Sequence, residues 1–248
     1  MTSMHARLSD LTRTLRYAVA CLGLATSLTL IARVAVLADD TPRPIIFLDP
    51  LISESEGDAG QGNDTALETS IQIANLLKLE ATQFGFSTLL STDTQTYRSI
   101  PQRRAFASNQ RALVYVAITS GPSKSGAQDC IHIYSPVTRK EVWVSDKKNG
   151  DTHPIVEMMR KQLDQENKML ASILQKTLNG AGVCATTATR RAAVLDLSMI
   201  PTVMLSFDAS PSRDAAAKQL DGKRLKKASS AVAVGLKEFV PQIRSLKR

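Results

Sequence analysis

The chain has 248 residues, of which 43% are hydrophobic and 22% are charged, and its formal net charge is +8. This composition is that of a globular protein long enough for one domain of roughly 200 residues plus a short extra segment. The basic residues are scattered and aromatic residues make up only 4% of the chain, which argues against nucleic-acid binding.

Residues 1–38 have the pattern of a targeting segment. Basic residues precede a 16-residue apolar run (17–32), and Val-Leu-Ala at 36–38 offers the small side chains of a signal-peptidase site. As a helix the run spans about 24 Å, which is short for a hydrocarbon core of about 30 Å. The pattern favours export with cleavage after Ala38. A signal anchor retained over residues 17–38 and a buried N-terminal helix of a cytosolic protein are the alternatives.

The rest of the chain is mildly basic and holds two cysteines. Residues 39–248 contain 27 Lys and Arg against 22 Asp and Glu, an excess of five positive charges that favours anionic surfaces. Cys130 and Cys184 can pair in an oxidising compartment. The sequence does not show that they lie close together, so a disulfide and two free thiols both remain open.

After a short linker at 39–43, strands alternate with helices. An apolar run predicts a first strand over Pro44–Asp49, and apolar residues at helical spacing predict a helix over 66–84 that ends at Gly85. The further predicted elements are strands at 86–90, 111–119, 130–136, 141–146, 193–197 and 201–207, and helices at 101–110, 154–178 and 222–240. This alternation predicts one α/β domain over residues 44–248, with a mostly parallel central sheet and helices on both faces.

Several segments between residues 44 and 244 resemble a known family in their order and spacing. They read IIFLDP, ETSIQIANLLKLEATQFGF, LSTDTQTYRSIPQRRAFASNQRALVYVAITSG and IPTVMLSFDAS, followed by a C-terminal helix. The family is that of the zinc-dependent N-acetylmuramoyl-L-alanine amidases, which cut peptidoglycan between the sugar and the stem peptide. Its first strand ends in Asp-Pro-Gly-His-Gly-Gly, a Glu opens the next helix, and later strands carry a second His and a second Glu.

The resemblance implies a degenerate metal site. Enzymes of the family hold zinc with two His and one Glu and leave a position open for water, while a second Glu acts as general base and acid. On this sequence the two His positions fall on Ile52 and Thr119, the Glu ligand on Glu68 and the general base on Ser206. Glu68 is then the only surviving ligand position. Neither a bound cofactor nor a catalytic residue is expected, and zinc is expected only if other residues supply ligands.

Three other polar residues offer substitutes for the missing groups. His132 alternates with apolar neighbours and fits a structural or surface histidine better than a ligand. His153 begins a predicted helix and fits a capping residue, whereas Asp208 would lie on the same side of a strand as Ser206. Ser206, His132 and Asp208 are also the residue types of a hydrolytic triad, but no Gly-x-Ser-x-Gly turn surrounds the serine. Glu68 also fits a carboxylate favoured by a helix N-terminus.

Two clusters of basic residues lie on predicted helices. Arg103-Arg104 and Lys223–Lys227 are interpreted as solvated helix faces, with binding of an anionic glycan or lipid as the alternative.

The sequence therefore predicts an exported, catalytically inactive amidase-like domain of the periplasm or cell envelope. Its expected partner is peptidoglycan or an envelope protein, and it contacts a membrane only if residues 17–38 are retained. The alternatives are an active, divergent zinc amidase and a membrane-anchored structural adaptor.

Overall fold

The computed structural model describes residues 43–51, 63–93, 99–122, 130–137, 154–195, 199–209 and 222–246. All of them belong to one unit of the chain, Arg43–Arg248. The predicted targeting segment and the predicted strand at 141–146 lie outside the described residues. Within the described ranges, no helix has the length and hydrophobicity needed to cross a bilayer.

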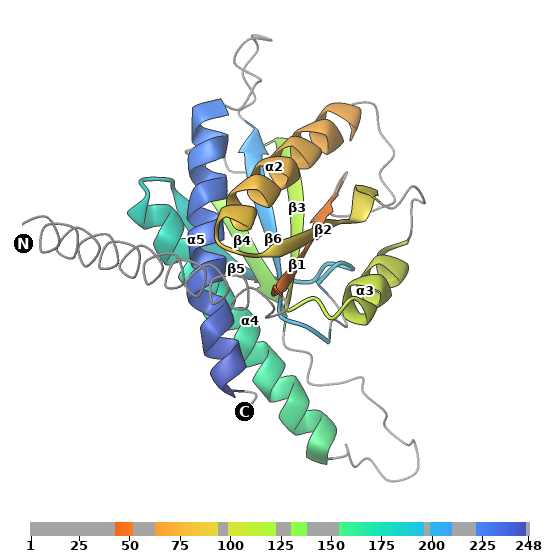
Figure 1. The fold of residues 1–248 in the computed structure, drawn as a ribbon. Helices are drawn as coiled ribbons and strands as arrows, with labels where there is room; N and C mark the ends of the chain where they lie inside the picture. Colours follow the sequence, from red (N-terminus) through yellow and green to blue (C-terminus); the bar gives the residue numbers. More distant parts are fainter. Residues whose placement is uncertain are drawn as a thin grey trace, which may run out of the picture. The chain divides into compact units, whose positions relative to one another are not determined.

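The core of the domain is a six-stranded sheet with the order β2-β1-β3-β6-β4-β5 (Figure 1). The first four strands in that order are parallel, β4 runs antiparallel to β6, and β5 runs parallel to β4. The predicted mostly parallel sheet is therefore confirmed. In chain order the strands are β1 (Ile45–Pro50), β2 (Ser87–Leu90), β3 (Val114–Pro122), β4 (Ile131–Pro136), β5 (Ala185–Arg190) and β6 (Thr202–Ala209).

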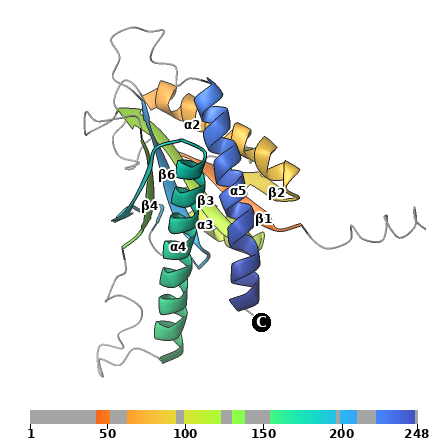
Figure 2. The same cartoon turned by 90° about the vertical axis from the view of Figure 1, so that its left-hand side faces the viewer.

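Helices cover both faces of the sheet, as predicted. One face packs against α2 (Asn63–Gln83), α4 (Pro154–Gly180) and α5 (Gly222–Leu246), which lie together on the same side of the sheet (Figures 1 and 2). A smaller apolar cluster on the opposite face includes residues of α3 (Ile100–Asn109). The central strands β1 and β3 are buried over most of their length, which explains why they read as continuous apolar runs.

One glycine lies where two helices of this layer approach each other closely. A Cβ atom on Gly235 of α5 would lie 2.8 Å from Leu174 Cδ2 and 2.9 Å from Thr177 Oγ1 of α4. A side chain there would require the Leu174 and Thr177 side chains to move, so glycine permits the close approach of the two helices. A second glycine, Gly85, has φ +80° just after α2, as its predicted place at the helix end requires.

One predicted strand is wrong and one strand was missed. Residues 193–195 form a turn, and their apolar side chains Val194 and Leu195 are buried in the cluster on the α3 face. An apolar run thus marks burial here without marking a strand. The missed strand is β5, whose sequence ATTATR is polar because most of its side chains are exposed. Its three threonines, which favour strands, were the available signal.

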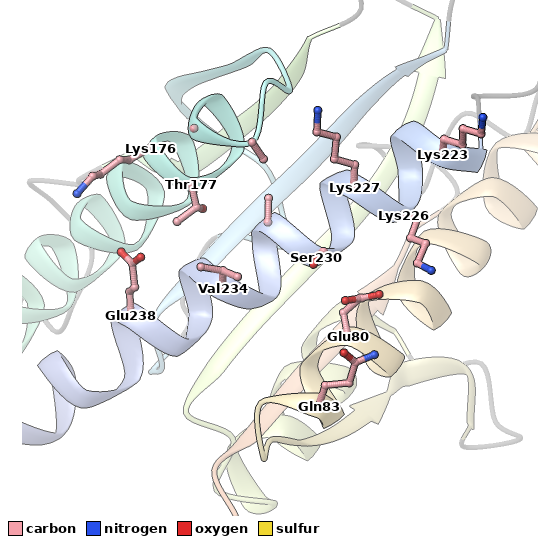
Figure 3. Close-up of a pocket in the computed structure, with 13 residues that line it drawn as sticks. Glu80, Gln83, Lys176, Thr177, Lys223, Lys226, Lys227, Ser230, Val234 and Glu238 are labelled. Atoms are coloured by element: carbon pink, nitrogen blue, oxygen red, sulfur yellow. The ribbon is translucent and has the colours of Figure 1, made fainter.

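An open depression of about 900 Å³ lies along α5, with α4 on one side and α2 on the other (Figure 3). Lysine side chains from α4 and α5 are among the residues that line it.

Candidate functional site

Three strands bring Thr119, Ser206 and His132 into one row across the sheet. Thr119 of β3 is the register partner of Ser206 of β6, and Ser206 is the register partner of His132 of β4. Residues directly opposite each other on paired strands place their side chains on the same face of a sheet. The row lies toward the carboxyl ends of β3 and β6, which is where ligands gather in mostly parallel sheets.

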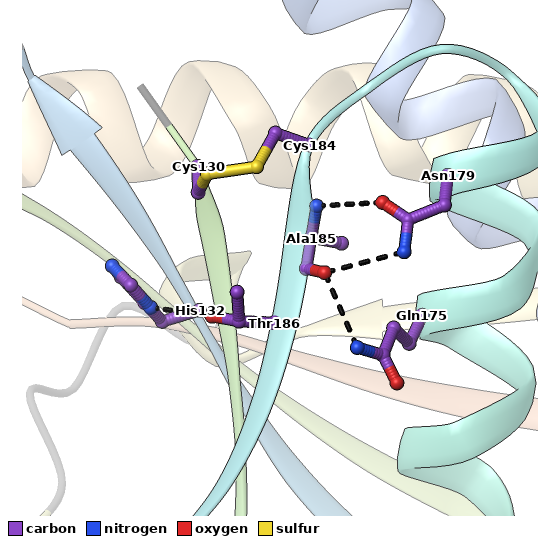
Figure 4. The surroundings of a disulfide bond; sticks show 7 residues. All are labelled: Cys130, His132, Gln175, Asn179, Cys184, Ala185 and Thr186. Atoms are coloured by element: carbon purple, nitrogen blue, oxygen red, sulfur yellow. Dashed lines mark hydrogen bonds between the residues drawn. A yellow bond between two sulfur atoms is a disulfide. The ribbon is translucent and has the colours of Figure 1, made fainter. Parts of the chain in front are cut away.

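The row continues onto β5 through a hydrogen bond. His132 Nδ1 lies 2.7 Å from Thr186 Oγ1, and the two residues are register partners in the β4–β5 pair (Figure 4). The imidazole also stacks on the ring of Tyr134 with centroids 6.1 Å apart, and the Arg190 guanidinium lies 4.9 Å from the centroid of that tyrosine ring. His132 is therefore a half-buried side chain that contacts residues of β4 and β5.

The start of α2 lies beside the end of β3. Ser120 Oγ donates a hydrogen bond to the carbonyl oxygen of Ala66 at 3.2 Å. Glu68 follows two residues later on the same helix, and its side chain is exposed. Ile52 and His153 lie outside the described residues. The Asp208 backbone pairs with Gly121, but the described part of the structure does not include its side chain.

The donor set at these positions does not fit zinc. Thr119 is buried and Ser206 is half-buried, and both offer only hydroxyl groups, which are poor zinc ligands. In the part of the chain that the structure describes, no group of three His, Cys, Asp or Glu side chains is placed to hold a metal ion.

A buried polar cluster at the end of β1 was missed by sequence reasoning. Arg103 Nε of α3 donates to Asp49 Oδ2 at 3.1 Å, and the Tyr115 hydroxyl donates to the same oxygen. Arg103 is 7% exposed and Asp49 is fully buried, so the interpretation of Arg103 as a solvated residue is wrong. The available signal was its spacing, because Ile100, Arg103 and Ala107 form the buried side of α3.

Burial dominates the electrostatics of this cluster. It raises the pKa of Asp49 above its ordinary value, although the Arg103 charge and hydrogen bonds from Ser91 and Tyr115 oppose the shift. Burial and the neighbouring carboxyl group also raise the pKa of Tyr115 well above its ordinary value. The Tyr115 hydroxyl therefore stays protonated near neutral pH and remains a donor to Asp49. The cluster fixes the chain where β1 ends, next to the hydrogen bond from Leu51 N to Ile118 O.

A disulfide lies at the same edge of the sheet as the row. Cys130 precedes β4 and Cys184 precedes β5, and their Cα atoms are 4.7 Å apart (Figure 4). The strands are parallel neighbours, so their first residues meet at one edge. The sequence left open whether the two cysteines form a disulfide or stay free thiols, and the structure shows the disulfide.

No protein-family model matches the sequence, and a search of curated proteins finds no match. Solved structures do match the fold. The catalytic domain of CwlV, an N-acetylmuramoyl-L-alanine amidase from Bacillus (Paenibacillus) polymyxa var. colistinus, aligns with a TM-score of 0.56 and 17% identity over 80% of this chain and 98% of that one. The apo form of the amidase Ami1 from Mycobacterium abscessus aligns with a TM-score of 0.56 and 16% identity over 79% of this chain and 98% of its own.

The chain has the fold of an N-acetylmuramoyl-L-alanine amidase catalytic domain. A further similar structure is the CwlD amidase from Clostridioides difficile in complex with the GerS lipoprotein, with a TM-score of 0.51 and 15% identity over 81% of this chain and all of that one. At these identities the likeness establishes the fold alone. The expected fold class is confirmed, and the chemistry has to be argued from this chain's own residues.

Proposed function

We propose that this protein is an exported, amidase-like domain that binds peptidoglycan, or an envelope protein associated with it, without cutting the peptidoglycan. The observation that carries the proposal is the adjacent pair Thr119 and Ser206 at the carboxyl ends of β3 and β6. By the family resemblance these are the positions of a zinc ligand and of the general base. In this chain both carry hydroxyl groups.

Two physical consequences follow for hydrolysis. Without an imidazole at Thr119, and with aliphatic Ile52 at the other histidine position, Glu68 alone cannot hold catalytic zinc, which usually takes three protein ligands. Water that is not bound to a metal keeps a pKa near 15.7, compared with about 7 on catalytic zinc. The Ser206 hydroxyl is not basic enough near neutral pH to take the proton of such a water.

The binding half of the proposal has separate support. The Cys130–Cys184 disulfide suits an oxidising compartment outside the cytoplasm. The positive excess over residues 39–248 favours an anionic surface such as the cell wall. The fold is shared with the catalytic domain of an N-acetylmuramoyl-L-alanine amidase. The strands β1, β3 and β6, whose carboxyl ends form the candidate site, are neighbours in the sheet.

The catalytic half is tested by metal content and cleavage. Purified protein should contain well under one zinc per chain and release no stem peptide from peptidoglycan. The combined change Ile52→His and Thr119→His should raise zinc affinity by orders of magnitude, because two imidazoles would join Glu68. Adding Ser206→Glu should give detectable cleavage. The matched control is the same set of changes with Glu68→Ala, which should lose the gained zinc.

The binding half is tested on purified sacculi. The unaltered protein should sediment with sacculi at low salt and be released as salt rises, because screening weakens attraction between surface charges. Failure to sediment, together with an absence of zinc and cleavage, would leave a protein partner as the remaining candidate. Protein recovered from the envelope fraction should begin after Ala38; an intact N-terminus there would indicate the membrane-anchored adaptor instead.

One observation favours a second candidate, an active divergent hydrolase. His132 stands directly across from Ser206, and Thr186 orients its imidazole. A histidine next to a serine hydroxyl group can act as a general base that removes the hydroxyl proton and so activates the oxygen as a nucleophile. This hypothesis predicts hydrolysis that is lost on His132→Gln and on Ser206→Ala. Stoichiometric zinc in the unaltered protein, lost on Glu68→Ala, would instead identify a working metalloenzyme and overturn the proposed function.

A further inference from the structure

Helix α5 begins with a concentration of positive charge. Lys223, Arg224, Lys226 and Lys227 fall within its first six residues, and its first turn contains no acidic residue. Each cation near a helix N-terminus is opposed by the positive end of the helix dipole. The three lysine side chains are exposed, so they are not part of the buried core. A sequence that breaks a local rule without a packing gain marks a place where function is expected.

These lysines belong to a groove built from more than one helix. Lys223, Lys226 and Lys227 of α5 and Lys176 of α4 line the depression of about 900 Å³, together with Glu80 and Glu238. Four positive side chains thus face two negative ones. Figure 3 shows Lys226 on the α2 side of α5 and Lys227 on the α4 side.

Three of the four groove lysines are available to a ligand. Within the described ranges, Lys176, Lys226 and Lys227 make no ion pair. Lys227 Nζ lies 3.4 Å from the position that a Cβ on Gly182 would take, so this side chain reaches over the end of α4. Lys227 of α5 and the residues at the end of α4 therefore lie together on one side of the groove.

We propose that this groove binds a phosphate-bearing polymer. Lysine ammonium groups bind phosphate oxygens as point charges, and a row of them suits a chain of phosphates whose spacing and orientation vary. Among the described residues that line the groove, none is aromatic, so stacking of nucleic-acid bases is not favoured. In the part of the chain that the structure describes, the aliphatic lining consists of Ala181, Ala231 and Val234, which offer little of the large apolar surface with which a membrane-binding helix inserts. This inference uses the helical layer, a surface different from the row of the proposed function.

The test uses the full chain and inorganic polyphosphate of defined length as the probe. Lys226→Gln with Lys227→Gln removes two charges from the groove. The matched control, Lys161→Gln with Lys168→Gln, removes two charges from α4 where the lysines pair with Glu157 and Asp164. Both double variants change exposed residues and lower the net charge equally. Polyphosphate should bind the groove variant about tenfold more weakly and the control almost as well as the unaltered protein.

The salt dependence gives a second readout. Two lost lysine–phosphate contacts should lower the slope of log affinity against log salt by roughly 1.4, since each contact on a flexible chain contributes about 0.7. Equal weakening in both variants would show an effect of net charge and overturn the proposal. So would an absence of polyphosphate binding at low salt, or binding to phosphatidylglycerol vesicles without binding to polyphosphate. Sacculi stripped of phosphate polymers test the proposed function separately from the groove. If the proposed function holds, the groove variant should sediment with them as well as the unaltered protein does.

Discussion

The centre of the sheet and its outer pair of strands are held together in different ways. β1 and β3 are buried on both faces by helices and apolar turns, and the buried polar cluster around Asp49 interrupts the apolar character of β1. β4 alternates between buried and half-buried residues, and β5 exposes most of its side chains. Cross-links hold that pair, because Asn179 and Gln175 hydrogen bond to the Ala185 backbone and the disulfide joins the strand starts (Figure 4).

This difference has a consequence for the row of polar residues. Thr119 and Ser206 belong to the well-buried centre, whereas His132 belongs to the outer pair. The spacing between the two hydroxyl groups is therefore fixed by burial. The position of the imidazole depends on the specific contacts of β4 and β5. Substitutions in the two regions should have separable effects, and four predictions test that separation.

The largest expected effect lies in the centre. Arg103→Leu leaves the buried Asp49 without its charged partner, so we expect a loss of about 3–5 kcal/mol in the free energy of unfolding. Urea unfolding near neutral pH measures it. The control is Arg103→Leu combined with Asp49→Leu, which removes both charges and should recover much of the loss. A single-variant loss well under 1 kcal/mol would mean that burial alone holds the centre.

The second effect concerns the outer pair. Cys130→Ser with Cys184→Ser removes a cross-link between residues 54 apart in sequence, and we expect a loss of about 2–4 kcal/mol. Reducing agent should destabilise the unaltered protein by a similar amount and leave the variant unchanged. Hydrogen exchange should quicken in β4 and β5 more than in β1 and β3. Uniform acceleration across the sheet would contradict the separation of the two regions.

The third effect tests the helical layer behind the centre. Gly235→Ala places a methyl group 2.8 Å from Leu174 Cδ2, so we expect a loss of about 1–3 kcal/mol from overpacking. Gly180→Ala is the matched control, because a Cβ there meets no atom within 4 Å. That change should be neutral or slightly stabilising, since alanine favours helices. Thermal unfolding of the two variants compares them directly, and equal losses would show that helix propensity, not contact, decides.

The smallest effect is a pH dependence in the centre. Because burial raises the pKa of Asp49, the folded protein keeps the carboxyl proton to a higher pH than the unfolded chain does. The unaltered protein should therefore lose stability relative to Asp49→Asn as pH rises from about 4 through the folded pKa, and the difference should then stay constant. Urea midpoints between pH 4 and 7 measure the trend. The opposite slope would show that the Arg103 charge outweighs desolvation.

The fold was largely predictable from the sequence because its centre follows simple patterns. The buried strands read as apolar runs, α2 as a helical repeat and Gly85 as a helix end. The polar strand β5 and the buried Arg103 were not predicted, because exposure gives a strand a weak apolar signal and a charged residue reads as surface.

The candidate site was less predictable for a geometric reason. Ser206 and His132 meet because β6 lies between β3 and β4, an order that differs from the order in the chain. A sequence pattern can place a residue on a strand, but it does not give the register of strands that are distant in sequence. The pairing of Cys130 with Cys184 depended on the same missing information, because β5 itself had not been predicted.

The disulfide also protects an exposed border of the sheet. In the described sheet β5 is the last strand and pairs only with β4, so its other side presents backbone groups that can template pairing with a foreign strand. Cys184 pins the start of β5, and Asn179 occupies both the N–H and the carbonyl of Ala185. A newly made chain whose thiols are still reduced would hold this border less firmly. We expect the reduced chain to self-associate through β5 more readily, and formation of the Cys130–Cys184 disulfide to suppress this association.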